Sequence, residues 1–139
     1  MGQNATILKA NFEDVQQISK KKSILINTLP NDMQDCLISG TISIKEEEKI
    51  MNSLLENNPD KVDIILYGMN SNDNSVLYKY QQLIKLGFTK VFIYSGGLFE
   101  WLCLQEIYGD DNFQTTKNEL DILKYKPKSI ETMKLICDQ

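Results

Sequence analysis

The chain has 139 residues and a formal net charge of −4 at pH 7, a size that suits one domain with a substantial core. The acidic balance argues against a nucleic-acid-binding protein, whose surface is usually basic. All 15 basic residues are lysines and there is no histidine, so the chain lacks both a side chain that titrates near neutral pH and an arginine for two-point binding of an oxyanion.

The three cysteines are widely spaced and odd in number, so they do not suggest a disulfide framework. We therefore expect a reducing, cytoplasmic location. No apolar stretch approaches the length of a membrane span, and we expect neither a spanning helix nor a secretory signal. Without histidine or a closely spaced cysteine pair, we also expect no metal site and no cofactor.

The first predicted elements lie before residue 28. Residues 5–9 predict a short edge strand, and Asn11 is a suitable N-cap for a helix that begins at Phe12. The only basic run, Lys20-Lys21-Lys22, is interpreted as a solvated turn. Residues 23–27 are apolar without alternation, which is typical of a central parallel strand.

The chain breaks at residues 29–32, where proline and turn residues gather. Residues 41–44 are then interpreted as a third strand. Residues 45–57 predict a helix, because their apolar side chains share one face and their acids lie at the N-terminal end. The sequence Asn58-Pro59-Asp60 ends this helix.

The clearest signals follow. Residues 62–67 form a short apolar run rich in β-branched side chains, which predicts a buried strand. Residues 68–74 consist of turn residues without periodicity and predict a loop. The next elements are a helix over residues 75–86 that Gly87-Phe88 ends, a strand over residues 90–94, and a helix over residues 98–108 after Gly96-Gly97.

Strands that alternate with helices predict an α/β fold, with a small, mostly parallel central sheet and helices on both faces. Ligand sites in such sheets lie at the carboxyl ends of the strands. Residues 109–139 are expected to form a C-terminal extension that packs on the domain or trails from it. It has apolar residues over 113–116 and 120–125 and a short helix over 130–136.

The order of elements over residues 62–101 resembles that of the rhodanese-like domain family. The shared order is strand, active-site loop, helix, Gly-Phe, strand and Gly-Gly-x-x-x-Trp, the last ending at Trp101. The resemblance covers roughly residues 5–108 and leaves residues 1–4 as an N-terminal segment. It implies the rhodanese-like version of the α/β fold.

The first half resembles the family more weakly. Residues 24–28 correspond to the family's Leu-Ile-Asp-Val-Arg strand, with Asn27 at the acidic position and Leu29 at the basic one. Residues 36–44 resemble the family's Gly-His-Ile-Pro-Gly-Ala-x-x-Ile segment, with the histidine and the proline replaced.

The resemblance places the family's nucleophilic cysteine at Gly68, which has no sulfur. In the family, the loop amides and the following helix lower the thiol pKa and hold the anionic product. The family's closing basic residue falls on Asp73 or Asn74, according to the loop length assumed. We therefore interpret this segment as a degenerate active-site loop. Two alternatives are a loop that still binds a neutral or weakly charged ligand, and an alignment error that hides the true nucleophile. The residues of the loop are Gly68, Met69, Asn70, Ser71, Asn72, Asp73 and Asn74.

The resemblance therefore predicts an inactive rhodanese-like domain that acts as a binding or regulatory module for an unknown protein partner. The alternative is an enzyme, a low-activity sulfurtransferase or sulfur carrier that uses Cys36 or Cys103 as a reactive thiol. Cys137 is a third free cysteine. A free cysteine is usually a small buried hydrophobe, which favours the first interpretation.

The N-terminal sequence Met1-Gly2-Gln3-Asn4-Ala5-Thr6 fits the pattern for N-myristoylation of Gly2, with coincidence as the alternative. One myristoyl chain binds membranes only marginally, and a polybasic patch is a usual second signal. Lys9 and the run from Lys20 to Lys22 are the candidates for that patch. If Gly2 is acylated, we expect peripheral association with the cytoplasmic face of a membrane.

Overall fold

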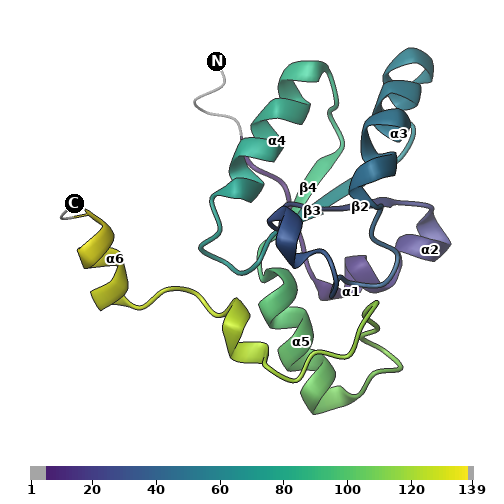
Figure 1. Cartoon of the computed structure of the whole chain (residues 1–139). Helices are drawn as coiled ribbons and strands as arrows, with labels where there is room; N and C mark the ends of the chain where they lie inside the picture. The colour runs from purple at the N-terminus through teal and green to yellow at the C-terminus, as the bar shows by residue number, and fades with distance from the viewer. Residues whose placement is uncertain (1–5, 138–139) are drawn as a thin grey trace.

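A computed structural model describes residues 6–137 of the chain, and its centre is a four-stranded sheet (Figure 1). All three pairings between its strands are parallel. The predicted α/β fold with a small parallel sheet is therefore confirmed. The strands lie in the order β1 (Lys9–Ala10), β4 (Val91–Tyr94), β3 (Ile64–Tyr67) and β2 (Ile24–Asn27).

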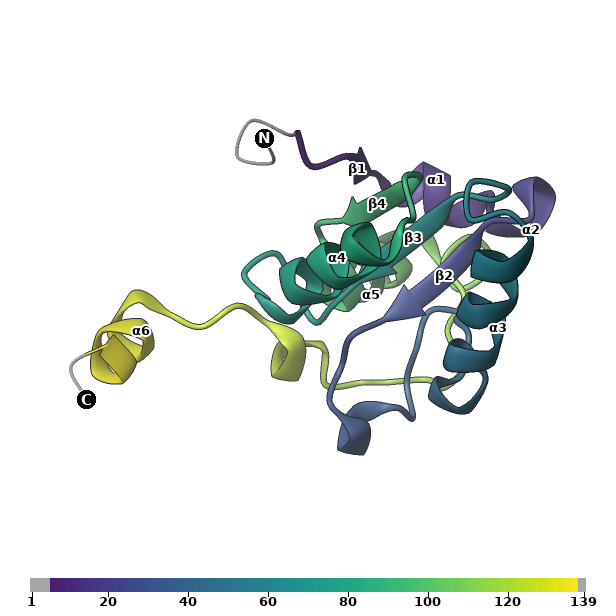
Figure 2. The same ribbon diagram turned by 90° about the horizontal axis from the view of Figure 1, so that it is seen from above.

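Helices cover both faces of this sheet, as predicted (Figures 1 and 2). Each face has its own apolar cluster, because successive side chains of a strand point to opposite sides. Leu25, Ile65 and Tyr67 point to one side, and Ile26 and Leu66 point to the other. The first side is covered by α1 (Phe12–Gln16), α2 (Ile18–Lys21) and α5 (Gly97–Tyr108), and the second by α3 (Ile44–Asn57) and α4 (Ser75–Leu86).

The predicted N-cap of the first helix is confirmed. The Asn11 side chain accepts a hydrogen bond from the Asp14 amide at 3.1 Å, and the Asp14 carboxylate accepts one from the Asn11 amide at 2.9 Å. This reciprocal pair is a capping box, which satisfies two amides that the first turn leaves free. It fixes the point at which the chain leaves β1.

Three strand predictions were wrong in part. The strand predicted over residues 41–44 does not form, because Thr41 makes a single parallel bridge with Leu25 and Ile44 already begins α3. The strand predicted over residues 5–9 is reduced to Lys9–Ala10, and Ala5 lies outside the described residues. The predicted central strand β2 stands at the edge of the four-stranded sheet.

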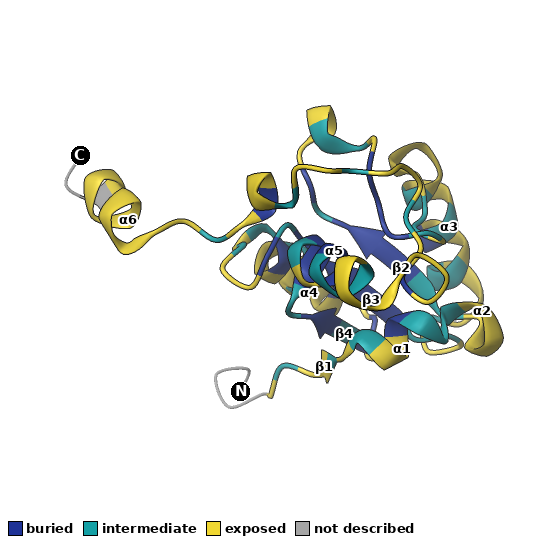
Figure 3. Cartoon of the chain, turned by 90° about the horizontal axis from the view of Figure 1, so that it is seen from below, coloured by how far each residue is buried: buried dark blue, intermediate teal, exposed yellow. Residues whose placement is uncertain are grey.

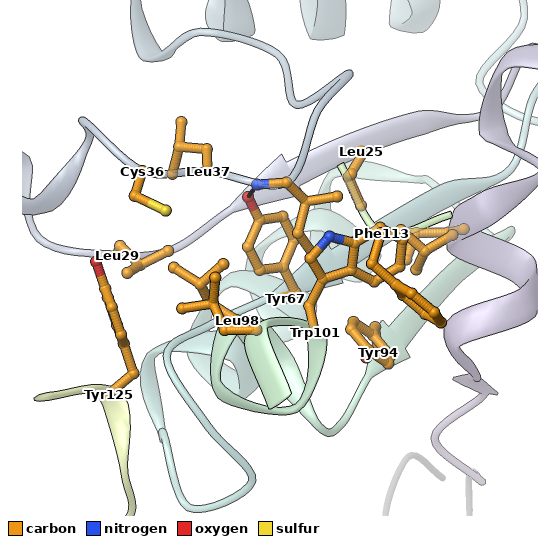
Figure 4. Close-up of a cluster of buried hydrophobic side chains, with 14 residues drawn as sticks. Leu25, Leu29, Cys36, Leu37, Tyr67, Tyr94, Leu98, Trp101, Phe113 and Tyr125 are labelled. Carbon is orange, nitrogen blue, oxygen red and sulfur yellow. Dashed lines mark hydrogen bonds between the residues drawn. The ribbon is translucent and has the colours of Figure 1, made fainter. Parts of the chain in front are cut away.

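The Tyr67 hydroxyl holds residues 38–41 in place beside the sheet. Thr41 donates its hydroxyl proton to the Ile38 carbonyl oxygen at 2.5 Å, so the Tyr67 hydroxyl donates to Thr41 at 2.7 Å. The same phenol oxygen accepts from the Ile38 amide at 3.1 Å (Figure 4). A side chain from β3 thus satisfies polar groups that a strand neighbour would otherwise satisfy.

The C-terminal segment first returns to the domain and then leaves it. Thr115 forms an antiparallel bridge with Ile38, and Phe113 and Tyr125 are buried in the cluster beside α5. A short 3-10 helix, η3 (Ile122–Tyr125), precedes α6 (Ile130–Cys137), which was predicted as a short helix and stands away from the body (Figure 3). Within residues 6–137, no helix has both the length and the apolar character needed to cross a membrane.

Candidate functional site

The loop at residues 68–74 connects the carboxyl end of β3 to α4, where ligand sites of parallel sheets are found. Asp73 organises this loop from within. One carboxylate oxygen accepts from the Met69 amide at 2.8 Å, and the other accepts from the Ser75 amide at 3.0 Å and the Ser75 hydroxyl at 2.6 Å. The side chain therefore satisfies amides at both ends of the loop, including the first amide of α4.

Gly68 lies directly against this carboxylate. A Cβ atom on Gly68 would come within 2.5 Å of Asp73 Oδ2 and within 2.5 Å of Val76 Cγ2. Both distances are shorter than real Cβ atoms show, so a side chain at position 68 requires its neighbours to move. Asp73 and Val76 therefore fill the space that the Cβ atom of a nucleophilic side chain at position 68 would need.

Asn70 gives the loop a second internal support and joins it to the C-terminal segment. Its side-chain oxygen accepts from the Asn72 amide at 2.9 Å, and its side-chain nitrogen donates to the Tyr125 carbonyl oxygen at 2.9 Å. Asn70 is one of two buried polar side chains among the described residues. Its buried groups are thus paired, as burial of polar atoms demands.

The start of α5 packs against the same loop. The Leu98 amide donates to the Gly68 carbonyl oxygen and the Phe99 amide donates to the Met69 carbonyl oxygen, both at 2.9 Å. Gly97 has φ of +66°, and a Cβ there would lie 2.6 Å from the Gly68 carbonyl oxygen. The Gly-Gly signature of the sequence therefore has a physical reason, because only glycine allows this approach of two backbones.

The two positions that the resemblance assigns to charged residues, Asn27 in β2 and Leu29 just after it, are neutral here. Asn27 is buried, and its side-chain oxygen accepts from Gln34 Nε2 at 2.8 Å and from the Leu29 amide at 3.0 Å. Asn27 also donates to Gln34 Oε1 at 3.1 Å. Leu29 is buried in the apolar cluster beside Cys36 (Figure 4). Leu29 thus contributes to core packing, and Asn27 forms a pair of side-chain amides with Gln34.

A cleft of about 500 Å³ opens beside the loop. It is lined by Thr28 and Pro30 just after β2, by residues of the loop, and by Lys128, Met133 and Ile136 of the C-terminal segment. The contribution of the C-terminal segment was not predicted, because residues 126–137 contain no signal for their position relative to the loop.

The candidate thiols lie outside this cleft. Cys36 is only 2% exposed, and its thiol donates to the Lys117 carbonyl oxygen at 3.4 Å. Burial, reinforced by Glu119, raises the pKa of Cys36. Burial and then Glu100 raise the pKa of Cys103, which is half-buried on α5. A raised thiol pKa lowers the fraction of nucleophilic thiolate at neutral pH.

Gly2, Cys137 and Lys9 are further residues that the sequence analysis singled out. Gly2 lies outside the described residues, and so does the side chain of Cys137. Lys9 donates to the Ser95 hydroxyl at 3.2 Å. Across residues 6–137, no group of three or more potential ligands among Cys, Asp and Glu could hold a metal ion.

Comparison with known families finds a match to the rhodanese-like domain over residues 5–103. A comparison with curated proteins finds no significant match. The matched range ends on α5 and includes the loop, the sheet and all elements between them.

Solved structures show the same fold. The BH2092 protein of Bacillus halodurans is 18% identical, with a TM-score of 0.57 over 92% of this chain and 89% of that chain. The rhodanese-like domain of the Anabaena protein Alr3790 is 16% identical, with a TM-score of 0.54 over 89% and 87%. Ygr203w, described as a yeast protein tyrosine phosphatase of the rhodanese family, is 14% identical, with a TM-score of 0.58 over 85% and 97%.

Proposed function

Because the chain belongs to the rhodanese-like domain family, we propose that it is a catalytically inactive member that acts as a binding or regulatory module. The observation that carries this proposal is the position of the Asp73 carboxylate, which accepts hydrogen bonds from both ends of the loop at residues 68–74. The Met69 and Ser75 amides are thus bonded to an intramolecular anion and are not free to bind an anionic substrate or product.

The chemistry of the loop supports inactivity in two ways. Gly68 supplies no sulfur for nucleophilic attack, and transfer of sulfur or phosphate by this route needs such an atom. The carboxylate of Asp73 also repels oxyanions, and no lysine lies between Gly68 and Asn74 to offset it. Both the reacting atom and the complementary charge are therefore missing from the loop.

The alternative function, sulfur transfer through another thiol, has less support. Cys36 points into the apolar cluster near Leu29 and Tyr125 (Figure 4). Burial raises the pKa of both Cys36 and Cys103, whereas reactive cysteines have lowered pKa values and partly exposed sulfur atoms. Neither residue lines the cleft beside the loop.

The cleft beside the loop is the proposed binding site of the module. Its apolar surface comes from Pro30, Met69, Met133 and Ile136, and the amide side chain of Asn72 adds hydrogen-bonding groups. Apolar walls with a few polar groups are typical of ligand-binding pockets. The occupant is expected to be a segment of a protein partner.

Membrane tethering is the further part of the proposed function. The sequence from Gly2 to Thr6 meets the acceptor pattern for N-myristoylation. An acyl chain would attach the module reversibly to a membrane and raise its concentration near partners there. The proposal of an inactive module does not depend on this modification.

The proposal is tested by turnover assays on the full chain. Sulfur transfer from thiosulfate to cyanide and hydrolysis of p-nitrophenyl phosphate are measured, the second because Ygr203w is described as a phosphatase. Cys36→Ser, Cys103→Ser and Cys137→Ser are measured beside the wild type. We expect no turnover above background in any of them, and no persulfide by intact mass after incubation with thiosulfate.

Two outcomes are decisive against inactivity. Turnover that disappears with one cysteine replacement would support the sulfur-carrier alternative. Turnover comparable to that of an active rhodanese and unaffected by all three replacements would show that the loop uses a different nucleophile. Gly68→Cys alone is expected to restore little activity, because Asp73 still occupies the loop.

A further inference from the structure

The helix α6 presents an apolar surface that is largely uncovered. It stands away from the domain at the end of residues 126–129 (Figures 1, 2 and 3). Its apolar side chains are exposed by 73% at Ile130, 44% at Met133, 66% at Leu135 and 48% at Ile136. Exposed apolar side chains that gather on one short helix mark a surface for interaction.

The spacing of these residues defines a stripe. Ile130, Met133 and Ile136 follow one another at intervals of three, which places them on one side of α6, while Leu135 falls outside the stripe. Met133 and Ile136 also line the cleft beside the loop. The apolar surface of α6 therefore begins at the cleft and includes the more exposed Ile130.

Lysines are concentrated between two groups of acidic residues in the same region of the chain. Residues 122–136 contain four lysines and one acidic residue, and Glu119, Asp121 and Asp138 flank this stretch. Lys124 pairs with Glu119, and Lys134 lies 3.9 Å from Glu131. The remaining two, Lys126 and Lys128, are exposed and make no salt bridge within residues 6–137.

We propose that residues 122–136 form a docking surface for an anionic membrane. A helix with exposed aliphatic side chains and adjacent lysines has the pattern of an interfacial helix, which combines apolar insertion with attraction to anionic headgroups. A stable protein interface usually buries about 800 Å² per partner, more than one eight-residue helix supplies. The inference rests on the proposal that the protein acts by binding, and it adds a membrane contact that needs no acyl chain.

The structure separates this surface from the other basic run. Lys20 and Lys21 end α2, which lies at the opposite end of the molecule from α6 in both views (Figures 1 and 2). A membrane that contacts the molecule at the α6 end is therefore distant from α2. This separation supplies a control of equal charge change, Lys20→Glu/Lys21→Glu against Lys126→Glu/Lys128→Glu.

The test is flotation of the full, non-acylated protein with vesicles of phosphatidylcholine alone or with phosphatidylserine added. We expect binding to the anionic vesicles that salt weakens. The pair Lys126→Glu/Lys128→Glu is expected to lower the partition coefficient at least about tenfold, since each lysine near an anionic surface contributes roughly fivefold. Lys20→Glu/Lys21→Glu is expected to change it less than about twofold, and Ile130→Glu to lower it without a change in circular dichroism.

The inference is overturned if the wild type does not bind, if both lysine pairs weaken binding equally, or if neutral vesicles bind as well as anionic ones. It is also overturned if sedimentation shows a dimer that Ile130→Glu dissociates while no vesicle binding occurs, since a second copy then covers α6. Turnover is measured on the same samples, so the failure of this inference is distinguished from activity that would contradict the proposed function.

Discussion

Gly97 lies against Gly68, and the Gly68 carbonyl oxygen accepts the Leu98 amide at 2.9 Å. A Cβ on Gly97 would stand 2.6 Å from that oxygen. Because this oxygen belongs to the backbone, it cannot move aside as a flexible side chain could. The start of α5 and the loop at residues 68–74 therefore form one packed unit. Any change at Gly97 is expected to move the loop.

This relationship predicts different costs for two glycines that both have positive φ. Gly97→Ala is expected to destabilise the protein by about 1–3 kcal/mol, because φ is positive and the contact is with backbone. Gly87→Ala is the control and should cost less, since its φ is also positive at +113° but its Cβ would meet no atom within 4 Å. Urea denaturation compares them, and equal costs would contradict the packed unit.

Two buried phenols should respond to different extents to removal of their hydroxyl groups. Tyr67→Phe leaves the Ile38 amide without its acceptor and is expected to cost about 1–3 kcal/mol. The Tyr94 hydroxyl is buried and makes no hydrogen bond of normal geometry with the described residues, although burial and then the nearby Glu100 carboxylate raise its pKa, so Tyr94→Phe should cost less than Tyr67→Phe. Thermal unfolding of both variants checks the pair, and a larger loss from Tyr94→Phe would reverse the expectation.

Trp101 is expected to stabilise the packing of α5. Its indole N–H donates to the Gln114 carbonyl oxygen at 3.0 Å, and its ring meets Phe113 edge to face with 5.1 Å between centroids. Trp101→Ala should cost roughly 3–5 kcal/mol. Ile107→Ala, at an exposed position of the same helix, should stay within about 0.5 kcal/mol. Denaturant midpoints that match for the two variants would exclude this role.

Acylation of Gly2 remains a prediction from the sequence alone. Coexpression with an N-myristoyltransferase should add one myristoyl group to the wild type and none to Gly2→Ala, as read by intact mass. The acylated protein should bind vesicles reversibly, because one chain gives an association constant of only about 10⁴ M⁻¹. Identical partition of acylated protein and Gly2→Ala onto anionic vesicles would remove the tether from the account.

The elements between residues 62 and 108 were predicted to within two residues at each boundary. Their signals are local: a β-branched run for β3, turn residues for the loop, helical spacing for α4 and Gly87-Phe88 at its end. The Gly-Gly-x-x-x-Trp pattern at residues 96–101 depends on Gly97. Position 97 requires glycine because the backbone of the loop comes close to it. These features need no knowledge of distant residues.

The features that the sequence predicted wrongly or missed depend on contacts between residues that are distant in the chain. Residues 38–41 are held by the hydroxyl of Tyr67, 26 residues beyond Thr41, which no local pattern announces. The resemblance put Asp73 or Asn74 at the position of the family's closing basic residue, but it did not show that the Asp73 oxygens accept hydrogen bonds from Met69 and Ser75. The order Asp73-Asn74-Ser75 before a helix is a capping pattern that could have suggested this position.

The most direct test of the account is a double-mutant cycle between Gly68 and Asp73, with free energies of unfolding from urea titration. Gly68→Ala should cost about 1–3 kcal/mol in the wild type, because the new Cβ meets Asp73 and Val76. In the Asp73→Ala background this cost should fall by at least about 1 kcal/mol, since half of the collision is gone.

Gly87→Ala provides the control, because it also has positive φ but meets no atom within 4 Å, and its cost should add to that of Asp73→Ala. A coupling between Gly68 and Asp73 of this size is the result that the filled loop predicts. Costs for Gly68→Ala and Asp73→Ala that add to within about 0.3 kcal/mol would contradict it, because Asp73 would then not occupy the space beside Gly68.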